Sequence, residues 1–242
     1  VLVSEDAASG TSLQTKSEVV QTLRAISTTP IALASGVLSS DLSDTELLAR
    51  RIMSGSYAGA SVTAQLQQLA TRQLPNGSIG SGQGSDGNVL DTAWAVKAYA
   101  AAGLGNDPVA VKARLYLVSQ VAADGQLVPV RGAGPVGSGS QLYQMAMVSL
   151  ALQTGADSSS QLSVGRLTSQ LVSKQSADGS WASDVLVTAR VLEAVASAKD
   201  LPEVRAKALS YLETRQSADG SWDGDAYLTA VALRGLTVQA PV

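Results

Sequence analysis

Three aspartates near the C-terminus could bind a cation, because carboxylate oxygens are the ligands that Ca²⁺ prefers. Asp219, Asp223 and Asp225 lie within seven residues of one another. Their spacing differs from that of an EF-hand loop, and Gly220 to Trp222 between them belong to a repeated turn described below. The sequence therefore favours a turn, with a calcium site as the alternative, and we expect no metal and no cofactor.

A second candidate site consists of bulky side chains at helical spacing in apolar segments, together with the carboxyl group of Asp91. Such residues could line a cavity that binds a small apolar ligand. The alternative is ordinary core packing, the more frequent role of aromatic and Met residues on a helix. The candidates besides Asp91 are Trp94, Tyr99, Tyr143, Met147 and Tyr227.

The residue types that are missing exclude several mechanisms. The chain contains no Cys, no His and no Phe. A Ser-His-Asp or Cys-His nucleophile, a thioester and a zinc site of the usual nitrogen and sulfur ligands are therefore excluded.

Two glycine-rich segments resemble binding loops. Gly82, Gly84 and Gly87 match the pattern Gly-x-Gly-x-x-Gly before a helix, but a dinucleotide site requires a preceding strand, whereas a helix and a loop are expected here. A flexible loop is the favoured interpretation. The segment 125–139 with Arg131 is either a binding loop or a tolerated insertion.

Composition limits the partners. Charged residues make up 15% of the chain and its net charge is −3, so nucleic acid is not an expected partner. No apolar run reaches the roughly 18 residues of a membrane span, so we expect no membrane insertion. The low charge and the many Gly, Ser and Thr residues favour an extracellular, periplasmic or cell-surface location.

The sequence repeats itself around four Asn-Gly or Asp-Gly turns, at Gly77, Gly125, Gly179 and Gly220. The last two copies share seven identical residues, in segments 175–181 and 216–222. The first copy keeps Gln73 but has Ile79 where the last two copies have Trp. The turn glycine supplies the positive φ that reverses the chain.

Each turn separates two helices of different character. Residues 202–216 begin with Pro202 and carry apolar residues on one stripe, which predicts a surface helix. Residues 185–198 are apolar nearly all round, which predicts an inner helix covered on both sides. The sequence therefore predicts an all-α chain of helical hairpins.

Two more helices are expected before the repeats, at about 15–27 and 43–53. Capping boxes predict their first turns, Thr15 with Glu18 and Ser43 with Glu46, and Pro30 should end the first helix.

The pattern Lys207, Tyr211, Gln216, Gly220 and Trp222 resembles the QW motif of the squalene-hopene cyclase and prenyltransferase repeat superfamily. The resemblance implies an α/α toroid, with inner helices around a cavity, outer helices outside them and an incomplete ring as one form. It also implies four repeats in residues 59–242, with an N-terminal segment, 1–58, packed onto them in the same domain. Structural roles in tying hairpins together are implied for Gln73, Gln175, Trp181, Gln216 and Trp222.

The activities of this superfamily need residues that the chain lacks. Its prenyltransferases hold zinc, and its thioester domains need Cys. Its class II terpene cyclases protonate their substrate from an Asp-x-Asp-Asp-Thr-Ala run, whereas residues 88–93 here keep Asp91 as their only acid. Because Asp91 has no neighbouring carboxylate in the sequence, we expect it to accept hydrogen bonds from the amides of residues 93 and 94 rather than to act as an acid.

These observations predict a non-catalytic binding or scaffolding module whose partner is an unknown protein or a small apolar ligand. One alternative is a degenerate terpene-cyclase-like protein or an isoprenoid- or corrinoid-binding protein. Another is a structural subunit that assembles with copies of itself.

Overall fold

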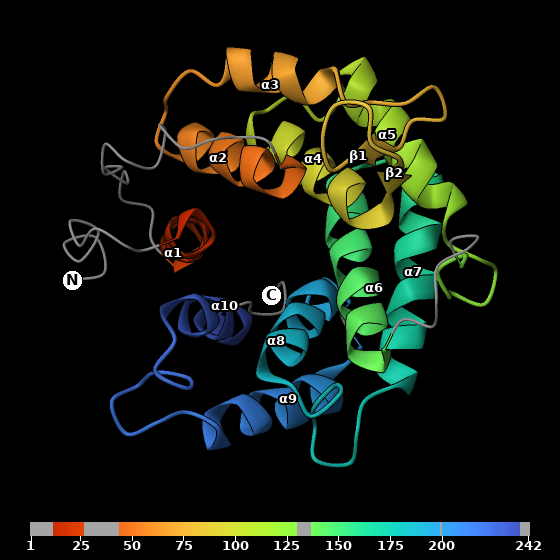
Figure 1. The fold of residues 1–242 in the computed structure, drawn as a ribbon. Coiled ribbons are helices and arrows are strands. Elements are labelled where there is room, and N and C mark those ends of the chain that lie inside the picture. The colour runs from red at the N-terminus through yellow and green to blue at the C-terminus, as the bar shows by residue number, and fades with distance from the viewer. Residues whose placement is uncertain (1–11, 27–43, 130–136, 199, 238–242) are drawn as a thin grey trace. The chain divides into compact units, whose positions relative to one another are not determined.

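The computed structural model describes residues 12–26, 44–129, 137–198 and 200–237. Within these ranges the chain forms ten helices and one pair of two-residue strands. The predicted all-α class is therefore confirmed. The elements in chain order are α1 (Leu13–Ile26), α2 (Thr45–Tyr57), α3 (Thr63–Ala70), β1 (Ile79–Gly80), β2 (Gly87–Asn88), α4 (Val89–Ala101), α5 (Pro108–Ser119), α6 (Ser138–Leu152), α7 (Ser158–Ser173), α8 (Val185–Val195), α9 (Pro202–Thr214) and α10 (Ala226–Thr237) (Figure 1).

The chain divides into two compact units, residues 1–117 and 118–242. The first unit holds α1 to α4 and most of α5, and the second holds α6 to α10. Within the first unit α2 and α4 pack against each other. The single domain expected from the sequence, with an N-terminal segment 1–58 packed onto repeats in residues 59–242, stays a prediction.

In the first unit α2 packs against both α1 and α4 (Figure 1). Its core includes a buried ion pair, in which Arg50 Nη1 lies 2.7 Å from Glu18 Oε2 and both side chains are fully buried. The Arg50 guanidinium also lies 4.2 Å from the centre of the Trp94 ring. A buried charge is tolerated only when it is paired, so this contact fixes how the three helices meet.

In the second unit α8 packs against α6 and α10 (Figure 1). From Val187 onward the apolar residues of α8 are buried, as expected for an inner helix. Gly235 of α10 lies directly against Ala189, since a Cβ at this glycine would be 3.2 Å from Ala189 Cβ. Glu193 of α8 binds Arg190 at 3.1 Å and Arg234 of α10 at 3.2 Å. The predicted inner helix is therefore confirmed at Val185–Val195 and the outer one at Pro202–Thr214.

The first two helices begin differently from the capping boxes that the sequence predicts. Thr15 lies inside α1, and its N–H donates to the hydroxyl of Ser12 at 3.2 Å. Asp44 caps α2 by accepting a hydrogen bond from Leu47 N at 3.1 Å. A carboxylate two or three residues before the amide is as effective a cap as a hydroxyl, so the neighbouring acid replaces the predicted residue. Ser43 and Pro30 lie outside the described residues.

The two Trp-containing turns have matching geometry. Trp181 and Trp222 are fully buried, and their indole N–H groups donate to Leu171 O at 2.6 Å and Leu212 O at 2.9 Å. Each indole therefore anchors the turn to the outer helix that precedes it. Their backbone N–H groups donate to a threonine hydroxyl of the following inner helix, Thr188 or Thr229, at 3.0 Å.

The Gly-x-Gly-x-x-Gly segment lies in a hairpin rather than in a βαβ unit. It joins β1 to β2, which are antiparallel, with Ile79 opposite Asn88 and Gly80 opposite Gly87. This geometry offers no strand-to-helix phosphate site of the dinucleotide type. Residues 130–136 of the second glycine-rich segment, which include Arg131, lie outside the described residues.

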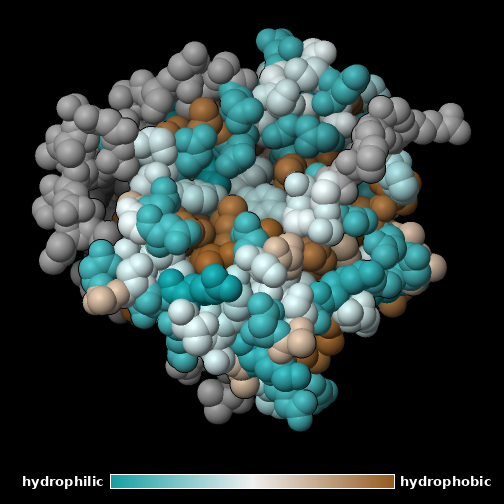
Figure 2. Space-filling model, turned by 60° about the horizontal axis from the view of Figure 1, so that its bottom comes forward, coloured by the Kyte–Doolittle hydropathy of each residue, from teal (hydrophilic) through white to brown (hydrophobic). Residues whose placement is uncertain are grey.

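The surface mixes polar and apolar residues. The face in Figure 2 shows hydrophobic residues in brown among hydrophilic residues in teal. Large apolar side chains that are exposed in the described ranges are Ile26, Leu104, Leu115, Val128 and Leu162. No helix of the described ranges has both the length and the apolar character needed to cross a bilayer.

We predict that Trp181→Ala and Trp222→Ala each lower the free energy of unfolding by about 3 to 5 kcal/mol, because each removes a fully buried ring and leaves a carbonyl without its donor. Urea denaturation measures the effect. Leu162→Ala is the matched control, since this side chain is 56% exposed and its loss should change stability little. A loss below about 1 kcal/mol at both Trp sites would contradict the anchoring role.

A second prediction concerns Asp157, the N-cap of α7. Its carboxylate accepts hydrogen bonds from Ser159 Oγ at 2.6 Å and Ser160 N at 2.8 Å, and these bonds lower its pKa from 3.8 to about 2. The stability that this cap contributes is present above pH 3.8 and is lost as the pH falls towards about 2. Asp157→Ala should therefore cost about 0.5 to 2 kcal/mol at pH 7 and much less near pH 2. Thermal unfolding across this range measures the difference, and a cost independent of pH would contradict it.

Candidate functional site

Asp91 lies in the first turn of α4, but it is not the cap of that helix. Asn88 is the cap, because its Oδ1 accepts a hydrogen bond from Asp91 N at 2.9 Å. The Asn88 side-chain amide then donates to Asp91 Oδ2 at 2.5 Å. The expectation that Asp91 accepts bonds from the amides of residues 93 and 94 is therefore wrong: the asparagine three residues earlier occupies the capping position.

The carboxyl group of Asp91 is held in conditions that favour its neutral form. The residue is only 8% exposed, and burial is the largest cause of a raised pKa. The hydrogen bond from Asn88 lowers the pKa, and the negative charges of Asp44 and Glu46 raise it further. Asp91 has no flanking carboxylate in its own segment, but the start of α2 supplies two carboxylates from more than forty residues away.

Arg72 connects the elements around Asp91. Its Nη1 donates to Thr45 Oγ1 at 2.8 Å and to Ser81 O at 3.1 Å, and the Thr45 hydroxyl donates to Gly80 O at 2.6 Å. The start of α2 is thereby tied to the hairpin that precedes α4. Burial lowers the pKa of Arg72, while the charges of Asp44 and Asp91 raise it. Arg72 therefore places a positive charge within electrostatic range of Asp44 and Asp91.

The other cavity candidates of the first unit have structural partners. Trp94 is 1% exposed, and one face of its ring is covered by Arg50, with Lys97 Nζ 5.3 Å from the ring centre. Tyr99 is 3% exposed and donates its hydroxyl to Leu66 O at 3.2 Å, and burial raises its pKa to about 12. Both rings therefore belong to the core of the first unit.

The candidates of the second unit differ in exposure. Met147 is fully buried on α6, whereas Tyr143 on the same helix and Tyr227 at the start of α10 are half-buried. Tyr227 precedes Leu228, which lines the cavity described next. Of the six cavity candidates, Tyr143 and Tyr227 are thus the ones with substantial exposed surface.

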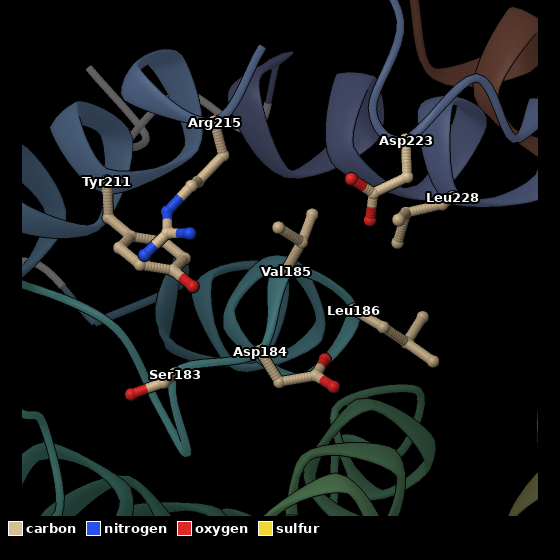
Figure 3. A pocket seen from close by; sticks show the side chains of 8 residues that line it. All are labelled: Ser183, Asp184, Val185, Leu186, Tyr211, Arg215, Asp223 and Leu228. Atoms are coloured by element: carbon tan, nitrogen blue, oxygen red, sulfur yellow. The ribbon is translucent and has the colours of Figure 1, made fainter. Parts of the chain in front are cut away.

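A cavity of about 390 Å³ lies in the second unit, at the starts of α8 and α10 and the end of α9 (Figure 3). The Arg215 guanidinium lies over the Tyr211 ring, 5.1 Å from its centre, and Asp184 and Asp223 place carboxylates elsewhere on the wall. Burial raises the pKa of Tyr211, while the charge of Arg215 lowers it. The lining residues are Ser183, Asp184, Val185, Leu186, Tyr211, Arg215, Asp223 and Leu228.

Sequence reasoning missed most of this cavity because its residues come from three separate segments. Two of the lining residues have a positive φ, Ser183 at 53° and Asp223 at 54°. The reason is local: both lie in tight turns in which Asp184 N or Asp225 N donates to the carbonyl of the preceding Trp. Consecutive positive φ values are characteristic of such turns, so this strain belongs to the turn. Asp184 caps α8 through Val187 N at 2.8 Å, which further commits it to structure.

The three aspartates considered for calcium serve separate structural purposes. Asp219 accepts hydrogen bonds from Ser221 N and Ser221 Oγ, which lower its pKa. Asp225 accepts from Leu228 N at 2.7 Å in the first turn of α10, and Asp223 lines the cavity. In the part of the chain that the structure describes, no three acidic side chains gather as a metal site. The geometry therefore gives the calcium alternative no support.

The environment of Asp91 predicts how stability depends on pH. Because its pKa is raised in the folded state, Asp91 is compatible with folding at acid pH, and it opposes folding as the pH rises above 3.8. Asp91→Asn removes the charge and keeps an acceptor for Asn88, so the variant should melt at a higher temperature than the wild type at pH 7 and at the same temperature near pH 3. Asp200→Asn, at an exposed position, is the control. A less stable Asn variant at pH 7 would contradict this assignment.

Comparisons with known proteins find likeness in structure alone. No family model matches the sequence, and no curated protein matches it. Among solved structures, a protein from Actinoplanes is 19% identical with a TM-score of 0.62, over 81% of this chain and 65% of that one. The ent-copalyl diphosphate synthase from Streptomyces platensis is 16% identical with a TM-score of 0.69, over 93% of this chain and 50% of that one. A type II terpene cyclase from Scytonema is 17% identical with a TM-score of 0.46, over 98% and 89% of the two chains.

The chain thus spans 65% and 50% of the length of the first two proteins, and it shares their fold. This likeness agrees with the cyclase-like superfamily that the QW motif suggested. The prediction that the chain is not an enzyme is wrong, because its fold over 93% of its length is that of an enzyme, a diphosphate synthase. The physical reason is that missing Cys and His exclude thiol, imidazole and zinc chemistry, whereas protonation of an alkene needs only a carboxylic acid.

Proposed function

We propose that this chain is a terpene-cyclase-like protein that binds a linear isoprenoid and protonates it from Asp91. The support from comparison is the fold of the ent-copalyl diphosphate synthase, with a TM-score of 0.69. The support from sequence is the segment 88–93, which resembles the acid-bearing run of the class II cyclases and keeps Asp91.

The observation that carries the proposal is the burial of the Asp91 carboxyl group at the start of an inner-type helix, within electrostatic range of Asp44 and Glu46. Burial and these charges raise its pKa. A general acid must be protonated at the working pH, and burial with neighbouring negative charges favours the protonated form of a carboxyl group. Asp44 and Glu46 provide the charges that the segment itself lacks, since Asn88 and Leu90 stand where the resemblance expects acids. The negative charges that the class II run carries within six residues therefore come, in this chain, from the start of α2.

The hydrogen bonds of Asp91 assign a role to each of its oxygens. Asn88 donates to Oδ2, so Oδ1 is the oxygen left to carry the proton. In the first step this O–H bond breaks, and the π electrons of a substrate alkene form the new C–H bond. The positive charge then falls on the more substituted carbon, where the next alkene attacks to close a ring. Loss of a proton from the last cation restores the acid, so the product is an isomer of the substrate.

Arg72 acts in the opposite direction to the two carboxylates, because its charge lowers the pKa of Asp91. It also holds Thr45 at the start of α2, next to Asp44 and Glu46. In this proposal Arg72 positions the carboxylates and stabilises Asp91 as an anion after the proton has left. Asp44 and Glu46 thus favour the protonated form of Asp91, and Arg72 favours its anion.

The test is incubation of the purified chain with squalene and, separately, with geranylgeranyl diphosphate, followed by mass-spectrometric analysis of the products. We expect a cyclised isomer from the wild type and at least a hundredfold less from Asp91→Asn, since a positioned acid contributes about 10² to 10⁴ in rate. Asp200→Asn should retain activity, and Glu46→Gln should shift the upper limb of the pH profile to lower pH.

If both substrates are recovered unchanged from the wild type, the proton-donor role is contradicted. Native mass spectrometry of the same sample would then show whether the chain holds an isoprenoid without converting it, which is the carrier alternative. Equal product from the wild type and Asp91→Asn would instead assign catalysis to another residue.

A further inference from the structure

The four repeat turns do not all have the same surroundings. Gly77, Gly125 and Gly179 are buried, whereas Gly220 is exposed. The two last turns are nevertheless identical in sequence over seven residues. The fourth turn therefore carries the same side chains as the third, but its glycine is exposed.

In the first three turns the glycine lies directly against the backbone of the next outer helix. A Cβ at Gly77 would lie under 3.0 Å from the carbonyl oxygen of Lys112 on α5, and one at Gly179 equally close to that of Lys207 on α9. Gly125 has the same relation to Arg166 on α7. Each contact lies within one unit, and each requires a residue without a side chain.

A glutamine reinforces two of these contacts. Gln175 Nε2 donates to Gly179 O of its own turn at 3.0 Å and to Val204 O on α9 at 2.8 Å. Gln73 Nε2 repeats the pattern with Gly77 O at 3.2 Å and Val109 O on α5 at 2.9 Å. The two protons of one amide thus connect a turn to the helix of the following hairpin.

The fourth turn has the first half of this arrangement without the second. Gln216 Nε2 donates to Gly220 O at 2.9 Å, so the amide is already oriented. Within the described ranges no helix carbonyl corresponds to Val204 O, and the only atom within 4 Å of a Cβ built on Gly220 is Gln216 Nε2 at 3.9 Å. Gln216 is exposed, whereas Gln73 and Gln175 are half-buried.

We propose that the fourth turn is a docking surface for the outer helix of another hairpin of this repeat. The partner is a helix of the α9 type, with a Lys or Arg thirteen residues before its own turn glycine, as Lys112, Arg166 and Lys207 are. The carbonyl of that residue lies on Gly220, and the carbonyl three residues earlier accepts the second proton of Gln216. This continues the interface that the first three turns establish.

A second copy of the chain is a poorer partner, because its own outer helices α5, α7 and α9 already contact a turn. The remaining one, α3, has Ala64 at the corresponding position and begins only at Thr63. The carbonyl needed by Gln216 would come from residue 61, before the helix starts. The proposed partner is therefore an additional hairpin rather than α3 of another molecule.

The experiment adds such a hairpin by repeating residues 196–237 once, directly after Leu236, in the 41-residue register of the last two turns. Gln216→Ala is then made in the original and in the extended chain, with Gln175→Ala in the original chain as the reference. We expect Gln216→Ala to lower the urea midpoint of the extended chain as much as Gln175→Ala lowers that of the original. In the original chain Gln216→Ala should change the midpoint little.

The proposal is overturned if Gln216→Ala has the same small effect in both chains, because the added helix would then not use this turn. It is also overturned if light scattering shows the original chain to be a dimer that Gln216→Ala dissociates, since a second copy would then occupy the surface. If the extended chain does not fold, the added hairpin supplied as a separate peptide, with exchange of the Gly220 amide as the readout, gives the same decision. Slowed exchange supports docking, and unchanged exchange opposes it.

Discussion

The close approach of the first three turn glycines to the backbone of the next outer helix is the contact on which the repeat depends. A positive φ and the absence of a Cβ are both required there, because a side chain at Gly77, Gly125 or Gly179 would overlap a helix carbonyl. Once the backbones lie this close, Gln175 can reach the carbonyl of the next helix while it holds its own turn. The buried indole of Trp181 then fixes the turn to the preceding helix. The turn after α7 is thus connected both to α7 and to α9. These connections keep the outer helices in place beside the inner helices, whose apolar faces are buried.

The same packing creates the electrostatics of the Asp91 site. The cap of α4 is Asn88, which leaves Asp91 free of capping and holds it by a single side-chain hydrogen bond. Burial in the first unit then raises its pKa, and the start of α2 brings Asp44 and Glu46 within electrostatic range. Arg72 connects that start to the hairpin before α4. The raised pKa of Asp91 therefore arises from contacts between elements that are distant in the sequence.

Residue absences constrain chemistry less than they first suggest. A chain without Cys or His loses thiol, imidazole and zinc catalysis, but a buried carboxylic acid remains available for proton transfer. The fold shared with a diphosphate synthase shows that this scaffold occurs in an enzyme. Trp94 follows the core-packing alternative that the sequence analysis considered, since one face of its ring is covered by the guanidinium of Arg50.

The sequence by itself determined the helical class, the positions of the turns and the distinction between inner and outer helices. Periodicity and turn residues are local signals, so α8 and α9 lie where the apolar patterns place them. Tertiary structure alone decided which polar groups meet. The pairing of Glu18 with Arg50, the carboxylates near Asp91 and the cavity around Arg215 each join segments that are far apart in the chain. No local pattern encodes such contacts, because they depend on which helix faces pack together, and the energy of burying a charge is set by that packing.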